Sequence, residues 1–130
     1  MAIQLSTDAA DTILKYLTGV TATTETLKLK LYSNNPTLSS LTVLSDFTEV
    51  TGGGYAEKAL SSTNWTAAGG VITSTPLLFT FTANIGEING YYLVGATSGK
   101  LIAFEKFSSG PFNIATNGDT ITVTATISVA

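Results

Sequence analysis

The 130-residue sequence lacks the side chains on which most small enzymes depend. It contains no histidine and no cysteine, and its six cationic residues are all lysine, so arginine is missing as well. Histidine and cysteine supply many of the proton shuttles, nucleophiles and metal ligands of enzymes. Without cysteine, disulfides and thiolate-metal sites are excluded. We therefore predict that the protein is not an enzyme and has no catalytic residue, no cofactor and no metal site.

Charge is also scarce in this chain. Only 12% of its residues are charged, against roughly 25% in typical soluble domains, and the net charge is −3. Because the lysines are scattered and arginine is absent, we expect no nucleic-acid partner. No apolar run approaches the roughly 20 residues that span a bilayer, and the first residues lack the basic region of a signal peptide, so we expect no membrane partner.

The mean hydropathy of +0.32 is high for a chain that folds alone. A surface with few charges and many apolar groups is typically covered by another chain. This composition favours an oligomer or a large assembly, and a monomer with a threonine-coated surface is the alternative.

Residues 7–18 are predicted to form one short N-terminal helix. Ser6 or Thr7 can cap its start, and Gly19 is placed to end it. Its apolar residues recur at helical spacing and form one stripe: Ala10, Ile13, Leu14 and Leu17. This stripe either covers part of the fold or contacts a neighbouring subunit. We assign residues 1–26 to the helix and a polar linker.

Residues 27–130 are predicted to form a single β domain. Residues 27–32 alternate leucine with lysine or tyrosine, and residues 120–129 alternate apolar residues with threonine or serine. Further strands are predicted at 47–50, 55–60, 71–74, 77–82, 85–94 with a kink at 89–90, 100–107 and 112–114, and a turn at 67–70. Turn signals recur every 8–12 residues. The fold class predicted is all-β: an antiparallel β-sandwich of jelly-roll or Greek-key type with one short N-terminal helix.

Three polar patterns have simpler structural interpretations than functional ones. Gly52–Gly54 lacks the Lys-Ser/Thr of a phosphate loop and is expected to form a tight turn with positive φ. Asn117 and Asp119 could hold Ca²⁺, but Asn-Gly before a strand is first of all a turn. The carboxylates outside the helix show no spacing that pairs them for catalysis: Asp46, Glu49, Glu57, Glu87, Glu105 and Asp119.

Four aromatic residues are candidate partner contacts: Tyr32, Trp65, Tyr91 and Tyr92. Tyr32 shares the lysine-bearing face of its predicted strand. Trp65, Tyr91 and Tyr92 suit stacking on a sugar or anchoring an interface. In a regular strand either Tyr91 or Tyr92 must point outward. Trp65 is either part of the core or a contact residue.

A succession of short motifs runs through residues 27–130. In order, they are L-K-L-K-L-Y-S-N at 27–34, F-T-E-V-T-G-G-G-Y at 47–55, N-W at 64–65, F-T-F-T at 79–82, I-N-G-Y-Y at 88–92, F-E-K-F at 104–107, P-F at 111–112 and N-G-D at 117–119. This succession resembles that of small virion proteins of tailed bacteriophages. Among them, the jelly-roll cement or decoration proteins of capsids best suit the size and composition.

The resemblance implies a function and a location. Such proteins typically sit as trimers on the outside of the capsid and clamp neighbouring capsomers. It therefore implies a capsid decoration protein, made in the host cytoplasm, that forms a homotrimer on the outer capsid surface of the virion with the major capsid protein as partner. The alternative is a tail, fibre or baseplate module that binds a host glycan or another tail protein. The family supplies no catalytic residues.

Overall fold

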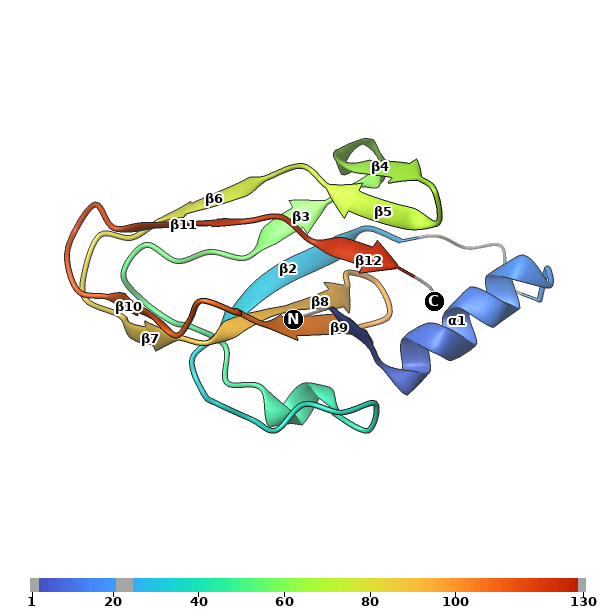
Figure 1. The fold of residues 1–130 in the computed structure, drawn as a ribbon, viewed down its shortest axis with the longest axis horizontal. Coiled ribbons are helices and arrows are strands. Elements are labelled where there is room, and N and C mark those ends of the chain that lie inside the picture. Colours follow the sequence, from blue (N-terminus) through green and yellow to red (C-terminus); the bar gives the residue numbers. More distant parts are fainter. Residues whose placement is uncertain (1–2, 21–24, 129–130) are drawn as a thin grey trace.

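The computed structural model describes residues 3–20 and 25–128. These residues form antiparallel β-sheets and one α-helix (Figure 1), which confirms the all-β prediction. The largest sheet has the strand order β1-β9-β8-β2-β3. It is built from β1 (Gln4–Leu5), β2 (Leu27–Tyr32), β3 (Lys58–Leu60), β8 (Gly90–Gly95) and β9 (Leu101–Lys106).

Three smaller groups of strands share a core with the five-stranded sheet (Figure 1). One has the order β12-β5-β4, and the other two are the pairs β11-β6 and β10-β7. Their bounds are β4 (Trp65–Ala68), β5 (Val71–Ser74), β6 (Leu77–Thr80), β7 (Gly86–Ile88), β10 (Phe112–Ile114), β11 (Thr120–Val123) and β12 (Thr126–Ser128). Single 3₁₀ turns occupy Leu44–Asp46 and Ser62–Asn64.

The helix α1 spans Thr7–Leu17, one residue shorter than predicted. The Ser6 hydroxyl caps it by accepting a hydrogen bond from the Ala9 N–H at 3.0 Å. Gly19, with φ of +76°, follows its C-terminal end. The helix contacts β9 and otherwise lies at one end of the molecule (Figure 1). No helix in the described residues has the length and apolar content that a membrane span requires.

Several predicted strands are shorter or interrupted in the structure. The strand expected at 120–129 divides into β11 and β12, because the Ser74 hydroxyl takes a ladder position and accepts from the Ala125 N–H. The strand at 85–94 divides at Asn89 into β7 and β8, as the predicted kink required. The predicted strand 47–50 is reduced to one bridge between Tyr32 and Glu49, and the strand at 55–60 is reduced to 58–60.

Two turn predictions had different outcomes. The turn expected at 67–70 is shorter, because β4 continues through Ala68 and pairs with β5. The three glycines at 52–54 all have positive φ, between +55° and +80°, which confirms the predicted turn.

The main core lies between the five-stranded sheet and the smaller sheets. It is formed by alternate residues of the strands on both sides, which is the pattern expected for strands with one buried face. Its largest fully buried members are Leu29, Leu31, Phe79, Phe81, Ile88, Tyr91 and Leu93.

A second core, the aromatic cluster, covers the opposite face of the five-stranded sheet. It consists of Tyr32, Phe47, Tyr92, Val94, Leu101 and Phe104. The long loop between β2 and β3 supplies Phe47, so this loop acts as a cover for the outer face of the sheet. The sheet is therefore buried on both faces over β8.

Candidate functional site

Strand β8 is buried on both faces, and this overturns one prediction. Either Tyr91 or Tyr92 was expected to point outward, yet the two side chains are only 1% and 3% exposed. Tyr91 belongs to the main core, whereas Tyr92 belongs to the aromatic cluster on the other face. The Phe47 ring stacks on Tyr92 with centroids 4.7 Å apart and planes at 7°. The covering loop thus removes Tyr92 from the surface, so neither tyrosine is placed to contact a partner.

Tyr32, the third tyrosine among the predicted contacts, is also fully buried. Its hydroxyl donates to the carbonyl oxygen of Glu105 at 3.2 Å, and its ring centroid lies 4.9 Å from that of Phe47. Burial, together with the Glu105 carboxylate, raises the pKa of Tyr32 to about 12. A Cβ at Gly90 would lie 2.3 Å from the Tyr32 hydroxyl, so this packing requires glycine. Tyr32 was predicted as a partner contact, but in the folded chain its side chain is enclosed beneath the same covering loop as Tyr92.

The hydroxyl of Tyr91 has a different environment. It is a buried side-chain oxygen with no hydrogen-bond partner among the described residues. Burial raises the pKa of Tyr91, and burial also raises the pKa of the Glu105 carboxyl nearby. Glu105 was interpreted from the sequence as solvated surface, but it is only half exposed here. The ring of Phe107, 6.1 Å from that of Tyr91, fills the adjacent space.

Trp65 is the one predicted contact residue that is partly exposed. It begins β4, at the edge of its sheet, and packs against the main core. The sequence left open whether Trp65 is part of the core or a contact residue. One portion of its side chain packs on the core, and the other portion is accessible.

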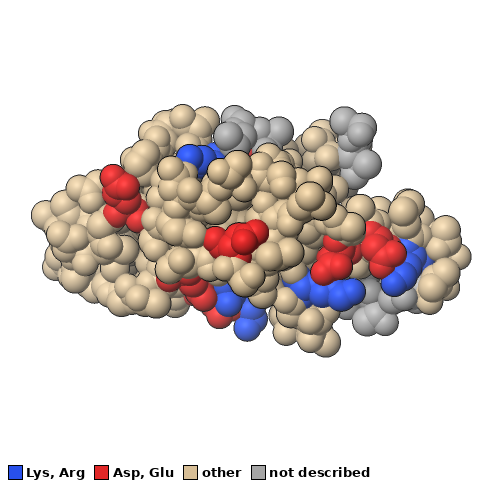
Figure 2. Space-filling view, turned by 90° about the horizontal axis from the view of Figure 1, so that it is seen from below, with Lys and Arg blue, Asp and Glu red and all other residues tan. Residues whose placement is uncertain are grey.

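Two carboxylates that the sequence does not pair come together across β2 and β3. Lys30 Nζ lies 3.3 Å from Glu49 and 4.0 Å from Glu57, and Lys28 Nζ lies 3.1 Å from Glu57. The Tyr55 hydroxyl donates to the remaining Glu49 oxygen at 2.8 Å. Two lysines thus balance two carboxylates, which is an ion-pair network. Figure 2 shows charges of both signs in small groups, with uncharged surface between them.

Asp119 holds a turn. Its carboxylate accepts hydrogen bonds from the N–H groups of Ala115 and Thr116 at 3.0 and 3.1 Å, and from the Thr116 hydroxyl at 3.1 Å. These main-chain hydrogen bonds lower the pKa of Asp119. The turn predicted at Asn117-Gly118 is confirmed. Within residues 3–20 and 25–128, the structure has no group of three His, Cys, Asp or Glu side chains that could hold a metal ion.

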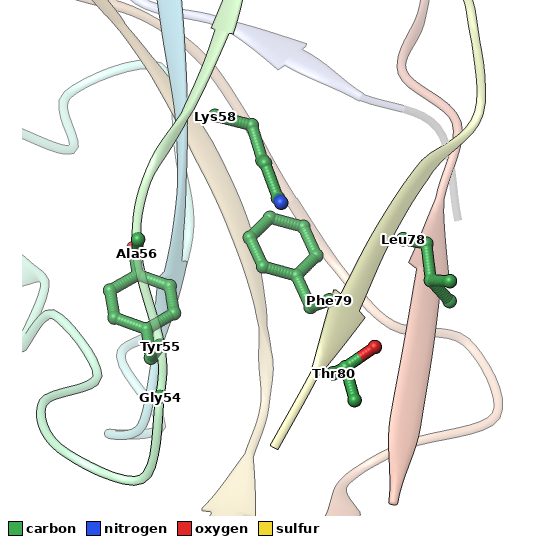
Figure 3. Close-up of a pocket in the computed structure, with 7 residues that line it drawn as sticks. All are labelled: Gly54, Tyr55, Ala56, Lys58, Leu78, Phe79 and Thr80. Atoms are coloured by element: carbon green, nitrogen blue, oxygen red, sulfur yellow. The ribbon is translucent and has the colours of Figure 1, made fainter. Parts of the chain in front are cut away.

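A small hollow opens between β6 and the segment that leads into β3 (Figure 3). The Tyr55 ring stacks on Phe79 with centroids 6.0 Å apart, and Lys58 Nζ lies 5.4 Å from the centre of the Phe79 ring. The hollow has a volume of about 160 Å³, below the 300–1,000 Å³ that ligand sites usually occupy. Its aromatic rings are occupied by each other and by the lysine, so it is a poor sugar-binding platform.

The exposed apolar side chains are a stronger functional signal than this small hollow. They form two groups, one at the C-terminal end of α1 and one in the loop between β2 and β3: Leu14, Tyr16, Leu17 and Val20, and Leu41, Val43 and Leu44. Leu17 and Leu41 are 74% and 81% exposed. The Thr7 hydroxyl donates to the carbonyl of Ser40 at 3.2 Å, which joins the loop to the opposite, N-terminal end of the helix. We call these seven side chains the helix–loop surface.

The helix–loop surface was only partly visible in the sequence. The helical stripe was predicted with a neighbouring subunit as one of two possible contacts, and the exposure of Leu14 and Leu17 favours that alternative. The leucines of the loop lie outside every helix and strand predicted from the sequence, so no sequence pattern identified them as a surface. A comparison with protein-family models, curated proteins and solved structures finds no match to this chain.

Proposed function

We propose that this chain is a structural protein of a tailed-bacteriophage virion, a capsid decoration or cement protein that acts by binding alone. The helix–loop surface carries the binding part of the proposal. Each of its two groups exposes three or four large apolar side chains close together in the sequence, and exposed apolar patches are typical of interaction sites. The order of motifs along residues 27–130 supports the virion part.

We further propose that the sheets form an open sandwich of jelly-roll type. Two features support this architecture. The main core is shared between the five-stranded sheet and the smaller sheets. The segment 86–95 runs from β7 into β8 with only Asn89 between them, and so passes from a smaller sheet into the large one.

The proposed partners are the major capsid protein and further copies of this chain, with a homotrimer on the outer capsid surface. The helix–loop surface would bind across the boundary of neighbouring capsomers and hold them together. Burial of its leucines would contribute roughly 25 cal/mol per Å² of apolar area. A chain without histidine or cysteine carries no group that titrates near neutral pH by default or oxidises to a disulfide, which suits a clamp outside the cell.

The proposal predicts a high copy number in the particle. Quantitative mass spectrometry of purified virions should give about one copy of this chain per major capsid subunit. A ratio far below that would assign the chain to the tail, and absence from the particle would overturn the virion assignment.

A second experiment tests the binding surface. Leu41→Ser should weaken binding to particles that lack the native protein by at least tenfold, and those particles should then burst at lower temperature. Leu78→Ser is the matched control, because Leu78 is 55% exposed on β6, outside the helix–loop surface. Equal binding by both variants would refute the assignment of this surface.

The tail-module alternative is less well supported by the packing. A glycan platform was expected to use exposed aromatic rings, and Tyr32, Tyr91 and Tyr92 are buried. Trp65 remains, at a partly exposed sheet edge. Glycan binding that is lost in Trp65→Ala would favour this alternative over capsid decoration.

A further inference from the structure

The strand edge formed by residues 120–128 has no partner among the described residues. β11 pairs only with β6, and β12 pairs only with β5. In an antiparallel ladder, alternate residues direct their N–H and C=O groups to the same neighbour. The N–H and carbonyl of Ala125 both bond to Ser74. The odd-numbered residues therefore direct their main-chain groups toward the neighbouring strands β5 and β6. The even-numbered residues therefore direct their main-chain groups away from β5 and β6, to the open side of the edge.

This edge differs from the other strand edges that the structure describes. Native proteins protect exposed edges by keeping them short or by adding charged residues or proline. The other edge strands are all short: β1 has two residues, β3, β7 and β10 have three each, and β4 and β6 have four each. Those of three residues include Lys58 in β3 and Glu87 in β7. By contrast, residues 120–128 contain no charged residue, no proline and no glycine. The longest open edge is thus the one without protection, as expected for an edge that is covered by another strand.

The order of hydroxyl and apolar side chains along this edge is the same when read in either direction. It is T-I-T-V-T-A-T-I-S, in which hydroxyl residues alternate with apolar residues on either side of Thr124. A two-fold axis through Thr124 would place it opposite its own copy. It would also set Thr122 against Thr126, Ile121 against Ile127 and Val123 against Ala125. Among the described residues, this register pairs all nine.

We propose that residues 120–128 pair antiparallel with the same strand of a second copy, about a two-fold axis at Thr124. The five outward-facing positions would form about ten main-chain hydrogen bonds along about 30 Å of strand. The threonines would form cross-strand pairs on the outer face, and the apolar residues would extend the inner face from one copy into the next. No like charges meet in this register.

This contact is independent of the virion assignment. A two-fold contact uses the same patch on both copies and closes at two chains, whereas a trimer needs two different patches. The trimer implied by the family resemblance would therefore use another surface, and the two assemblies differ in mass. Failure of the strand pairing leaves the capsid proposal open to its own test, and the reverse also holds.

Cysteine substitution tests the register directly, because the chain has no native cysteine. Directly opposed residues of a hydrogen-bonded antiparallel pair have Cα atoms about 5.5 Å apart, within the range that a disulfide spans. Purified Thr124→Cys should therefore convert mostly to a disulfide-linked dimer under mild oxidation. Thr122→Cys alone should not, since the two copies of position 122 would lie about 13 Å apart along the strands. Mixing Thr122→Cys with Thr126→Cys should restore the crosslink.

Thr66→Cys is the matched control for reactivity, because Thr66 is exposed on β4, at the other edge of the same sheet. Crosslinking of Thr66→Cys or Thr122→Cys to the same extent as Thr124→Cys would overturn the proposal, as would a folded Thr124→Cys that stays uncrosslinked.

Sedimentation of the cysteine-free chain gives an independent measurement. The expected result is a reversible dimer whose dissociation constant rises at least tenfold in Thr124→Lys, which places two like charges on the axis, and is unchanged in Thr66→Lys. Circular dichroism confirms that both variants fold. A monomer at all concentrations, or a trimer unaffected by Thr124→Lys, would refute the two-fold contact.

Discussion

Truncation of Phe47 tests whether the loop between β2 and β3 is an integral part of the fold. Phe47 is 8% exposed and is the residue of this loop that enters the aromatic cluster, where its ring lies 4.7 Å from Tyr92 and 5.7 Å from Phe104. The loop is also held by the side chain of Asn34, which bonds the carbonyl of Asp46 and the N–H of Thr48, and by the main-chain hydrogen bond from Val50 to Leu31. Phe47→Ala removes the anchor and leaves these polar contacts in place.

The expected cost is about 3 kcal/mol in the free energy of unfolding. Fully buried phenylalanine costs about 3–5 kcal/mol when truncated to alanine, and the residual exposure of Phe47 places it at the lower end. For a domain of this size, that loss lowers Tm by about 10 °C. Leu41→Ala is the matched control in the same loop. Because Leu41 is 81% exposed, its truncation should change stability by no more than about 0.5 kcal/mol.

Urea unfolding at 25 °C measures both variants, with an unchanged m-value as the sign that only stability has changed. Tyrosine titration gives a second readout. Burial raises the pKa of Tyr32 to about 12, so loss of the covering ring should move this value toward 10. A loss below about 1 kcal/mol for Phe47→Ala, or one no larger than for Leu41→Ala, would show that the loop is not a structural cover.

Three further substitutions test local features of the fold. Gly90→Ala should cost at least about 2 kcal/mol in urea unfolding, because the new Cβ would lie 2.2 Å from the carbonyl oxygen of Glu105; a neutral effect would contradict this packing. Ser6→Ala should cost about 1 kcal/mol through loss of the hydrogen bond from the Ala9 N–H, seen as lower helix content at intermediate urea; unchanged stability would refute the cap. Main-chain hydrogen bonds lower the pKa of Asp119, so its ionised form stabilises the fold above about pH 4 and this contribution is lost as pH falls through the lowered value. Asp119→Asn should therefore be less stable than the native chain at pH 7 and equally stable near pH 2, and a constant difference across this range would refute the linkage.

The elements that the sequence predicts well are those with one buried face. The alternation at 27–32 matches β2 residue by residue, because this strand presents alternate side chains to the main core. The bounds predicted at 71–74 also match those of β5. The helix start is equally local, since Ser6 caps its own first turn. These features depend on neighbours within a few residues, so a single sequence contains the information.

The predictions that failed depend on contacts between distant residues. The pattern Tyr91-Tyr92 does not predict whether the outer face of β8 is exposed to solvent. That face is covered by Phe47, which lies more than forty residues earlier in the sequence. The division of the last strand likewise depends on Ser74, whose hydroxyl bonds Ala125. The carboxylates Glu49 and Glu57 meet at Lys30 because the Tyr32–Glu49 bridge and the pairing of β3 bring both segments beside β2.

The faces of the large sheet are covered, whereas the helix–loop surface and the strand edge at 120–128 are not. The chain covers both faces of its large sheet with its own residues, even the tyrosines that could have served as contacts. Yet it leaves the leucines of the helix–loop surface and the uncharged edge at 120–128 exposed. A monomer selected for solubility would be expected to place charges at such positions, because single charges there cost little and oppose association. Their absence at both places is consistent with two separate contacts, one apolar and one made by strand pairing, and such a chain is suited to link neighbours in a larger assembly.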